Sequence, residues 1–574
     1  MRIADFPIAT ALRRSLQQGY PLARFRQDLL AGLVVGIVAL PLSMALAIAV
    51  GAPPQHGLYT AIVAGIVVAL TGGSKHNVSG PTAAFIVILA PILGKYGLSG
   101  LLTAGLMAGV LLVAMGAMRL GRLIQFIPHP VTTGFTAGIA VVIATLQLKD
   151  ALGLHVEKMP DGYIEKIGAM WEARRSASIY ELVVAAVMLA MLLGVPRVTK
   201  AIPAPLVALV LVTLLSLAAA RVVPGFDVAT IGSRFHTTVG GRVIAGIPPL
   251  PPTPMLPWGG GHLSFSQLRE LFPAALAIAM LGAIESLLCA VIADGMTGKV
   301  HDPNAELVGL GLGNIVAPFF GGIAATGALA RTATSIRAGA TSPIAAVVHA
   351  LVVLFAVLLL APLVAYVPMA ALAGLLLLVA WNMSDVRHAL HILKVAPRSD
   401  IAVLLTCFVL TVVFDMVVAI GVGVVLAALL FMRRMSEMTH TRALSMPEIE
   451  TTRKAPPDVA VYEIAGPLFF GAAQKAMGAF ATTGTARAIV VALGRVPAID
   501  ATGLVALESM IARLQSAKKL VILAGPFPEP RSVFDKANLE DEHENTFLAE
   551  TLDEGIKLAA DLVHLTPVSL RPTS

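Results

Sequence analysis

The chain has 574 residues, of which 57% are hydrophobic and only 13% are charged, and its mean hydropathy is +0.84. The charged fraction is about half of that in soluble domains, which argues against a soluble protein and indicates a polytopic membrane protein. We assign the formal net charge of +7 to cytoplasmic loops rather than to a nucleic-acid partner. Cys289 and Cys407 both lie in apolar runs, so neither a disulfide framework nor a thiolate metal site is expected.

The segment 1–27 precedes the first apolar run and is rich in arginine: Arg2, Arg13, Arg14, Arg24 and Arg26. The positive-inside rule therefore places this N-terminal segment in the cytoplasm. No cleavable signal is expected, because the apolar run that begins near Leu29 is long enough to span a membrane.

A transport domain is predicted at 28–433, built from two sets of seven apolar segments. The repeats cover about 28–223 and 268–433, on either side of a polar, proline-rich connector at 224–266. An odd-numbered repeat duplicated in tandem must be inverted. An even total of fourteen segments returns the chain to the cytoplasm, consistent with two arginines directly after the last segment. The predicted segments are 28–50, 57–72, 81–94, 98–118, 126–148, 179–195, 203–223, 268–292, 303–320, 328–338, 343–362, 367–381, 400–415 and 417–432.

The third segment of each set reads as a half-helix that follows a Gly-Gly pair, Gly72-Gly73 or Gly321-Gly322. The second one holds about ten helical residues, about 15 Å of helix against about 30 Å of hydrocarbon. Irregular backbone at this depth is tolerated only where it is buried or lines a cavity. Two interrupted segments in corresponding positions point to a midplane binding site. The unpaired N–H groups and the macrodipole at each half-helix N-terminus favour an anion.

Glu285 lies deep in the apolar segment 268–292, where an acid is costly and is functional by default. It could take up a proton on one side of the membrane and release it on the other; the alternative is a structural carboxylate. Arg331, at the start of the second half-helix, could bind an anionic substrate in bidentate fashion or pair permanently with Glu285. Ser79, Thr82 and Thr326 are candidate hydroxyl ligands, or helix caps.

After Met446 the composition becomes that of a soluble α/β domain, predicted at 447–574 together with a C-terminal tail. Its alternating strands and helices favour a sheet covered by helices. The predicted strands are 459–464, 488–493 and 520–524, and the predicted helices are 474–480 and 504–514.

Three motifs resemble the SulP family, the bacterial members of solute carrier family 26. They are Gly-Pro-Thr-Ala-Ala-Phe at 80–85, Gly-Ala-Ile-Glu-Ser-Leu-Leu-Cys-Ala at 282–290, and Asn-Ala-Glu-Leu-Val-Gly-Leu-Gly at 304–311. The tail is similar to the STAS domain that this family carries at its C-terminus. Within the family, the sequence looks closest to proton-coupled dicarboxylate transporters of enteric bacteria, whose substrates include succinate, fumarate and aspartate. Other members carry sulfate, bicarbonate or chloride.

The resemblance implies that each repeat divides into a core, its first four segments, and a gate, its last three. It implies an elevator movement of the core against the gate, with the substrate held between the half-helix N-termini. Sodium-coupled members often have Asp where this chain has Glu285, so a proton gradient is expected, with sodium as the alternative and no other cofactor. The implied substrate-binding residues are Ser79, Gly80, Thr82, Ala83, Gly327, Ala328, Leu329, Ala330 and Arg331.

The resemblance also implies a homodimer in the bacterial inner membrane, with both termini in the cytoplasm. Residues 499–504 resemble the STAS loop in which a serine is phosphorylated in anti-sigma-factor antagonists. Because that position is Ala501 here, we do not expect a phosphorylation switch at it. Asp500 and Thr502 are candidates for regulation or for contact with a cytoplasmic protein, or else they cap the following helix.

No zinc-protease, phosphate-loop or nucleophile-elbow motif occurs, so no enzymatic activity is expected. The two half-helix N-termini and Arg331 offer about two positive charges, which suit a divalent anion if Glu285 is protonated. The sequence thus predicts proton-coupled dicarboxylate uptake. The alternative is sulfate or bicarbonate transport coupled to protons or sodium. An anion channel and a STAS-dependent signalling receptor are rivals from other classes.

Overall fold

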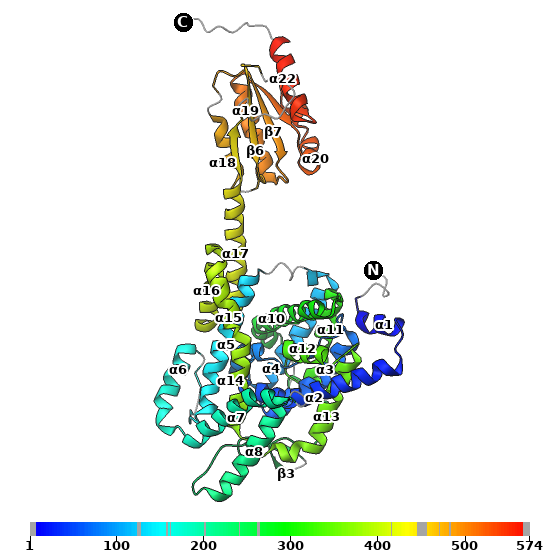
Figure 1. Cartoon of the computed structure of the whole chain (residues 1–574), viewed down its shortest axis with the longest axis vertical. Helices are drawn as coiled ribbons and strands as arrows, with labels where there is room; N and C mark the ends of the chain where they lie inside the picture. The colour runs from blue at the N-terminus through cyan, green and yellow to red at the C-terminus, as the bar shows by residue number, and fades with distance from the viewer. Residues whose placement is uncertain are drawn as a thin grey trace. The chain divides into compact units, whose positions relative to one another are not determined.

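The structure, a computed structural model, describes residues 7–122, 128–156, 159–160, 162–199, 203–239, 242–260, 264–414, 416–444, 456–469, 471–481 and 484–565. The chain divides into two compact units, residues 1–424 and 425–574 (Figure 1). Within the described residues, ten helices are long and apolar enough to cross a membrane. A polytopic helical membrane protein is therefore confirmed, while the count of fourteen segments stays a prediction.

The first unit is helical, and its helices follow the predicted segments closely. The long ones are α2 (Leu22–Val50), α3 (Pro54–Thr71), α4 (Ile86–Ala117), α5 (His129–Ala151), α7 (Ile179–Val198), α8 (Ala204–Val222), α10 (Phe265–Thr297), α11 (Pro303–Val316), α13 (Ile344–Val364), α14 (Met369–Ser384) and α16 (Arg398–Val413). The shorter ones are α1 (Thr10–Gln17), α6 (Tyr163–Glu172), α9 (Ile231–Arg234), α12 (Leu329–Arg337) and α15 (Val386–Val395). Helix α17 (Met416–Met438) crosses the division between the units.

The two predicted half-helices differ in how they end. The second is the separate short helix α12, whereas the first runs on into the next predicted segment as part of α4. The two parts of α4 meet at Gly97, whose φ of 66° and ψ of −174° are not helical. A positive φ is readily adopted only by glycine, so this residue lets the chain change direction between the half-helix and the segment that follows.

The main helix contacts are preserved when the two halves of the unit are exchanged. The contact of α2 with α13 corresponds to that of α10 with α4. The contact of α3 with α13 corresponds to that of α11 with α4, and the contact of α16 with α5 to that of α7 with α14. The helices α2, α3, α4 and α10 to α13 thus form one group, and α5, α7, α8, α14 and α16 another. These groups match the expected core and gate, except that the predicted gate segment 417–432, which lies in α17, is in neither group.

Glycines let the core helices approach one another closely. A Cβ atom at Gly309 would lie 2.5 Å from the Cα of Gly72, and one at Gly311 would lie 2.7 Å from the carbonyl oxygen of Gly109. Small residues play this part in membrane helix packing, because apolar lipid gives helices little hydrophobic reason to associate. In the connector, β2 (His236–Val239) pairs antiparallel with β3 (Arg242–Ala245).

The second unit contains a five-stranded sheet in the order β5 (His440–Ala443), β6 (Val459–Ala465), β7 (Ala488–Arg495), β8 (Leu520–Ala524) and β9 (Thr546–Ala549). β5 is antiparallel to β6 and the other pairings are parallel. The sheet therefore begins before residue 447, the start predicted for this domain, because β5 adds an edge strand.

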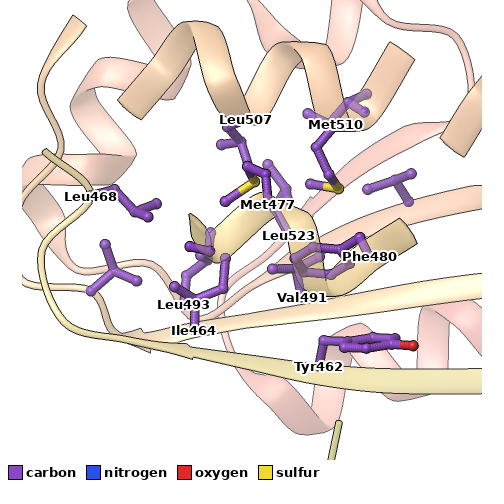
Figure 2. Packing of buried hydrophobic residues seen from close by; sticks show 14 of the residues in the cluster. Tyr462, Ile464, Leu468, Met477, Phe480, Val491, Leu493, Leu507, Met510 and Leu523 are labelled. Carbon is purple, nitrogen blue, oxygen red and sulfur yellow. The ribbon is translucent and has the colours of Figure 1, made fainter. Parts of the chain in front are cut away.

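Helices cover both faces of this sheet. On one face, α18 (Ala473–Gly478) and α19 (Ala501–Ser516) enclose an apolar core with β6, β7 and β8, and Figure 2 shows Leu507 and Met510 of α19 above Ile464 and Leu493. On the other face, α22 (Leu552–Leu565) packs through Ile556. The remaining helices are α20 (Pro528–Lys536) and α21 (Leu539–Glu542). The expected sheet covered by helices is confirmed.

Candidate substrate site

The two non-helical stretches that interrupt the helices, called the first and second break, begin at Gly72-Gly73 and at Gly321-Gly322. They meet in a short antiparallel pairing. β1 (Ser79–Gly80) pairs with β4 (Thr326–Gly327), so that Ser79 lies opposite Gly327. β1 leads into η2 (Ala83–Phe85) and α4, and β4 leads into α12. Because each strand immediately precedes a helix, the pairing brings together two helix N-termini with their unpaired N–H groups.

Two glycines in this pairing have no room for a side chain. A Cβ atom at Gly80 would lie 2.5 Å from Nη1 of Arg331. A Cβ atom at Gly327 would lie 2.8 Å from Nδ2 of Asn77 and 3.0 Å from the Cα of Ser286. Contacts below 3.0 Å force the neighbours to move, so glycine at both positions lets polar groups lie directly against the strands.

Arg331 is fully buried, with 0% of its surface exposed. Its Nη2 donates to Oγ of Ser43 on α2 at 3.1 Å and to the carbonyl oxygen of Pro81 at 3.2 Å. Its Nε and Nη1 have no hydrogen-bond partner among the described residues. A buried guanidinium with two open donor nitrogens retains capacity for an anion.

Glu285 is half-buried on α10, and its Oε2 accepts a hydrogen bond of 3.0 Å from Oγ1 of Thr82. Thr82 makes no side-chain capping bond to the helix that follows it, so its hydroxyl serves the acid instead. Among the hydrogen bonds and ion pairs of the described residues, none joins Glu285 to Arg331. The ion pair between Arg331 and Glu285, which was the alternative role for Arg331, is therefore not formed in this conformation.

The two charged groups instead flank one short stretch of backbone. Arg331 binds the carbonyl of Pro81, and Glu285 accepts from the next residue, Thr82. An anion at the paired helix N-termini would have the guanidinium nearby and would be repelled by Glu285 whenever that acid is ionised. The predicted role of Glu285 in proton coupling is compatible with this arrangement and stays a prediction.

The other predicted site residues fall into two sets. Ser79, Ala83 and Ala328 are buried, and Oγ of Ser79 has no partner among the described residues. Leu329 is 44% exposed, and the neighbouring Ala330 is exposed as well. Thr326 donates to the carbonyl oxygen of Gly282 at 2.9 Å, so its hydroxyl joins β4 to α10.

Sequence reasoning missed a buried acid, Glu306 on α11, that holds the first break in place. Its Oε2 accepts from the backbone N–H groups of Gly73 at 3.0 Å and Ser74 at 2.9 Å. Its Oε1 accepts from Nδ2 of Asn77 at 2.5 Å and from Oγ of Ser286 at 3.2 Å. Four donors compensate the desolvation of this carboxylate, which is 1% exposed.

This network continues to the second half-helix. Oγ1 of Thr332 on α12 donates to Oδ1 of Asn77 at 3.2 Å, and accepts from the backbone N–H of Val78 at 2.9 Å. The first break and helices α10, α11 and α12 are therefore tied to Glu306 directly or through Asn77. The signal was present in the sequence, since Glu306 is an acid inside an apolar segment just as Glu285 is.

In the STAS-like unit, Asp500 is the N-cap of α19. Its Oδ1 accepts from the backbone N–H of Gly503 at 2.7 Å, which agrees with the capping alternative for this residue. Thr502 is exposed on the first turn and leaves a hydroxyl on the surface. A regulatory role for either residue stays a prediction.

A duplicated bundle with a core group and a gate group of helices, and two helix N-termini brought together by the pairing of β1 with β4, define a secondary-transporter fold. The family follows from comparison with known sequences: residues 25–407 match the model of the sulfate permease family and residues 450–554 match the STAS domain. The chain belongs to the sulfate permease family.

Curated relatives extend over nearly the whole chain. YvdB of Bacillus subtilis (strain 168) is 39% identical over 91% of this chain and 95% of its own length. Its name describes it provisionally as a sulfate transporter. The bicarbonate transporter BicA of Picosynechococcus is 30% identical over 90% of this chain and 91% of its own length. These relatives are transporters, so the chain is an anion transporter rather than an enzyme.

Solved structures agree on the fold. The transmembrane domain of a cyanobacterial BicA matches 71% of this chain and 98% of its own, with 28% identity and a TM-score of 0.59. SLC26A9 matches 96% of this chain and 93% of its own, with 18% identity and a TM-score of 0.80; this likeness shows the fold alone. The relatives' names favour sulfate or bicarbonate over the dicarboxylates that the sequence predicted.

Proposed function

We propose that this protein is a secondary active transporter that moves sulfate into the cell, with proton coupling at Glu285. The observation that carries the proposal is the pairing of β1 with β4, which sets two helix N-termini beside the buried, partly open guanidinium of Arg331. Sulfate also has the support of YvdB, the relative named for it with 39% identity. A bicarbonate substrate is the second candidate, because BicA is similar over almost its full length.

Charge balance favours a divalent anion when Glu285 is neutral. Two helix N-termini contribute about half a positive charge each, and Arg331 adds one. Ionised Glu285 would cancel about half of this, which leaves enough for monovalent bicarbonate. Proton uptake by Glu285 therefore favours sulfate binding, and proton release on the other side of the membrane favours sulfate dissociation.

Alternating access would come from movement of the core helices against the gate helices. Thr82 and Arg331 lie on the two half-helices, and Ser43 and Glu285 lie on other helices of the core group. Substrate and coupling residue would consequently move together as one body. We further propose a homodimer in the bacterial inner membrane, with both termini cytoplasmic and the STAS domain contacting a cytoplasmic protein.

The test is uptake of labelled sulfate into proteoliposomes whose interior is alkaline. Wild type should accumulate sulfate when the pH gradient is imposed. Glu285→Gln, which keeps an oxygen for the Thr82 hydroxyl, should lose the dependence on the gradient. The control is Glu181→Gln, because Glu181 is a buried acid on α7 whose Oε1 accepts from the backbone N–H of Ala229; this variant should behave like wild type.

Parallel uptake assays with labelled bicarbonate or labelled succinate in the external medium identify the substrate. Assays with an imposed sodium gradient identify the coupling ion. Bicarbonate uptake without sulfate uptake would move the substrate to the second candidate. Succinate uptake alone would restore the dicarboxylate prediction. A gradient response that persists in Glu285→Gln would refute this residue as the coupling site, whatever the substrate proves to be.

A further inference from the structure

A basic pocket of about 610 Å³ lies apart from the substrate site, where α1, the end of α4 and the start of α11 meet. Among the described residues, four arginines line it: Arg13 and Arg14 on α1, and Arg119 and Arg122 just after α4. None of the four makes a side-chain hydrogen bond or ion pair among the described residues. All four side chains are exposed. Like charges gathered without counter-ions repel one another, so an anion bound between them would be favoured, most of all at low ionic strength.

Hydrogen bonds of the backbone position the segments that surround the pocket. The backbone N–H of Ala9 donates to the carbonyl oxygen of Thr71 at 2.6 Å, which fixes α1 to the end of α3. The backbone N–H of Gly121 donates to Oδ1 of Asn304 at 3.1 Å, which ties the turn after α4 to α11. Hydrogen bonds therefore hold α1 against the end of α3, and the turn after α4 against the start of α11, within one compact unit.

Among the described residues that line the pocket, Asp302 carries the only carboxylate, and it does not neutralise the arginines. Oδ1 of Asp302 accepts from the backbone N–H groups of Asn304 and Ala305 at 3.1 and 3.2 Å and so caps α11. The described lining thus holds four arginines and one carboxylate, which is already engaged by a helix terminus.

A buried histidine supplies a second, independent observation. His301 is 8% exposed and lines the pocket. Its Nδ1 lies 2.6 Å from Oδ2 of Asp294, so the carboxylate accepts from Nδ1 and orients the ring. Its Nε2 is buried and has no partner among the described residues. An oriented imidazole with an open nitrogen can hydrogen-bond to a ligand in the pocket.

We propose that this pocket binds a phosphate-bearing anion, held by Arg13, Arg14, Arg119 and Arg122. Guanidinium forks match phosphate oxygens in bidentate fashion and are preferred for this group. The volume is in the range of pockets that enclose a ligand of several heavy groups, and it exceeds what one transported sulfate would fill. Binding would tie α1 to α4 and α11, and so would stabilise the core next to the Gly72-Gly73 break.

The phosphate can belong to a lipid headgroup or to a soluble molecule. The lipid source is supported by exposed apolar side chains close to the pocket in sequence: Leu16 is 56% exposed, Leu22 is 65% exposed and Phe25 is 40% exposed. Apolar side chains beside basic ones are typical of helices that lie at an anionic membrane surface. The predicted cytoplasmic position of the N-terminus agrees with such a surface.

The experiment measures binding to the purified full-length protein in a neutral detergent. The probes are dioctanoyl phosphatidylglycerol, dioctanoyl phosphatidylcholine and inorganic pyrophosphate. The variants are the double substitutions Arg13→Ala with Arg14→Ala, and Arg119→Ala with Arg122→Ala. The matched control is Arg387→Ala with Arg398→Ala, which removes the same charge from exposed positions outside the pocket. Thermal unfolding of each variant verifies that it is folded.

Saturable binding of phosphatidylglycerol or pyrophosphate, weakened about tenfold by each pocket variant and unchanged in the control, would support the site; removal of two charge-assisted contacts justifies this magnitude. Binding of phosphatidylglycerol alone would identify a lipid source, and binding of pyrophosphate a soluble one. Equal loss in the control would show a non-specific charge effect and overturn the proposal. So would the absence of binding by both phosphate probes, or equal binding of phosphatidylcholine.

Discussion

We expect the buried carboxylate of Glu306 to hold the first break in position at the substrate site through its hydrogen bonds. We consider two substitutions, Glu306→Ala and Glu306→Gln. The alanine variant removes the acceptor of four donors: the backbone N–H groups of Gly73 and Ser74, Nδ2 of Asn77 and Oγ of Ser286. The glutamine variant keeps one oxygen and replaces the other by an amino group.

The magnitudes follow from the number of donors left without an acceptor. A buried donor that loses its partner costs about 1 to 3 kcal/mol. Glu306→Ala leaves four donors without an acceptor and should therefore lower the stability of the core by about 4 kcal/mol or more. Glu306→Gln can serve two of the four donors, so it should cost about 2 kcal/mol. Both variants remove hydrogen bonds that position the first break. We therefore expect the helix N-terminus after β1 to shift relative to the one after β4.

Two measurements separate positioning from simple stabilisation. Thermal unfolding of the full-length protein in detergent should rank wild type above Glu306→Gln and that variant above Glu306→Ala. Sulfate uptake by Glu306→Gln should show a raised KM, because the binding geometry is disturbed. Loss of folded protein alone would lower the maximal rate and leave KM unchanged.

Glu181→Gln is the control, since it changes a buried acid whose Oε1 accepts from one backbone N–H. It should unfold near the wild-type temperature and keep the wild-type KM. If Glu306→Gln matched wild type in both unfolding temperature and KM, the positioning role would be wrong. If the stability fell but KM held, Glu306 would be structural only.

Three further substitutions test other parts of the chain. Gly80→Ala places a Cβ 2.5 Å from a guanidinium nitrogen and should reduce uptake about tenfold, whereas at Gly94 the added Cβ meets nothing within 4 Å and uptake should persist; equal uptake by both variants would count against the close approach. Burial and the hydrogen bond to Asp28 raise the pKa of Tyr20 to about 12. The stabilisation by Tyr20 is complete below its unfolded pKa of about 10 and is lost as the pH rises toward the folded value. The unfolding-temperature difference between wild type and Tyr20→Phe should therefore narrow between about pH 10 and about pH 12; a constant difference would contradict this. Asp500→Ala should cost about 1 kcal/mol and speed hydrogen exchange in the first turn of α19, and unchanged exchange there would argue against the cap.

Much of the architecture was determined by local features of the sequence. Hydropathy located the membrane helices to within a few residues, because a spanning helix needs a long apolar run of nearly fixed length. The two Gly-Gly breaks located both half-helices, and the alternation after Met446 located the sheet strands except for β5 and β9. These features depend on neighbouring residues, so the sequence alone contains them.

The connections between distant segments were decided only by the tertiary structure. Ser79 and Gly327 are far apart in the sequence and yet pair directly. Arg331 binds Ser43 and the carbonyl of Pro81 rather than Glu285. The role of Glu306 and the gathering of arginines from α1 and the end of α4 were likewise hidden. A hydrogen bond or a shared pocket requires a particular packing of helices, and the order of residues along one helix does not specify which distant group will meet its side chain.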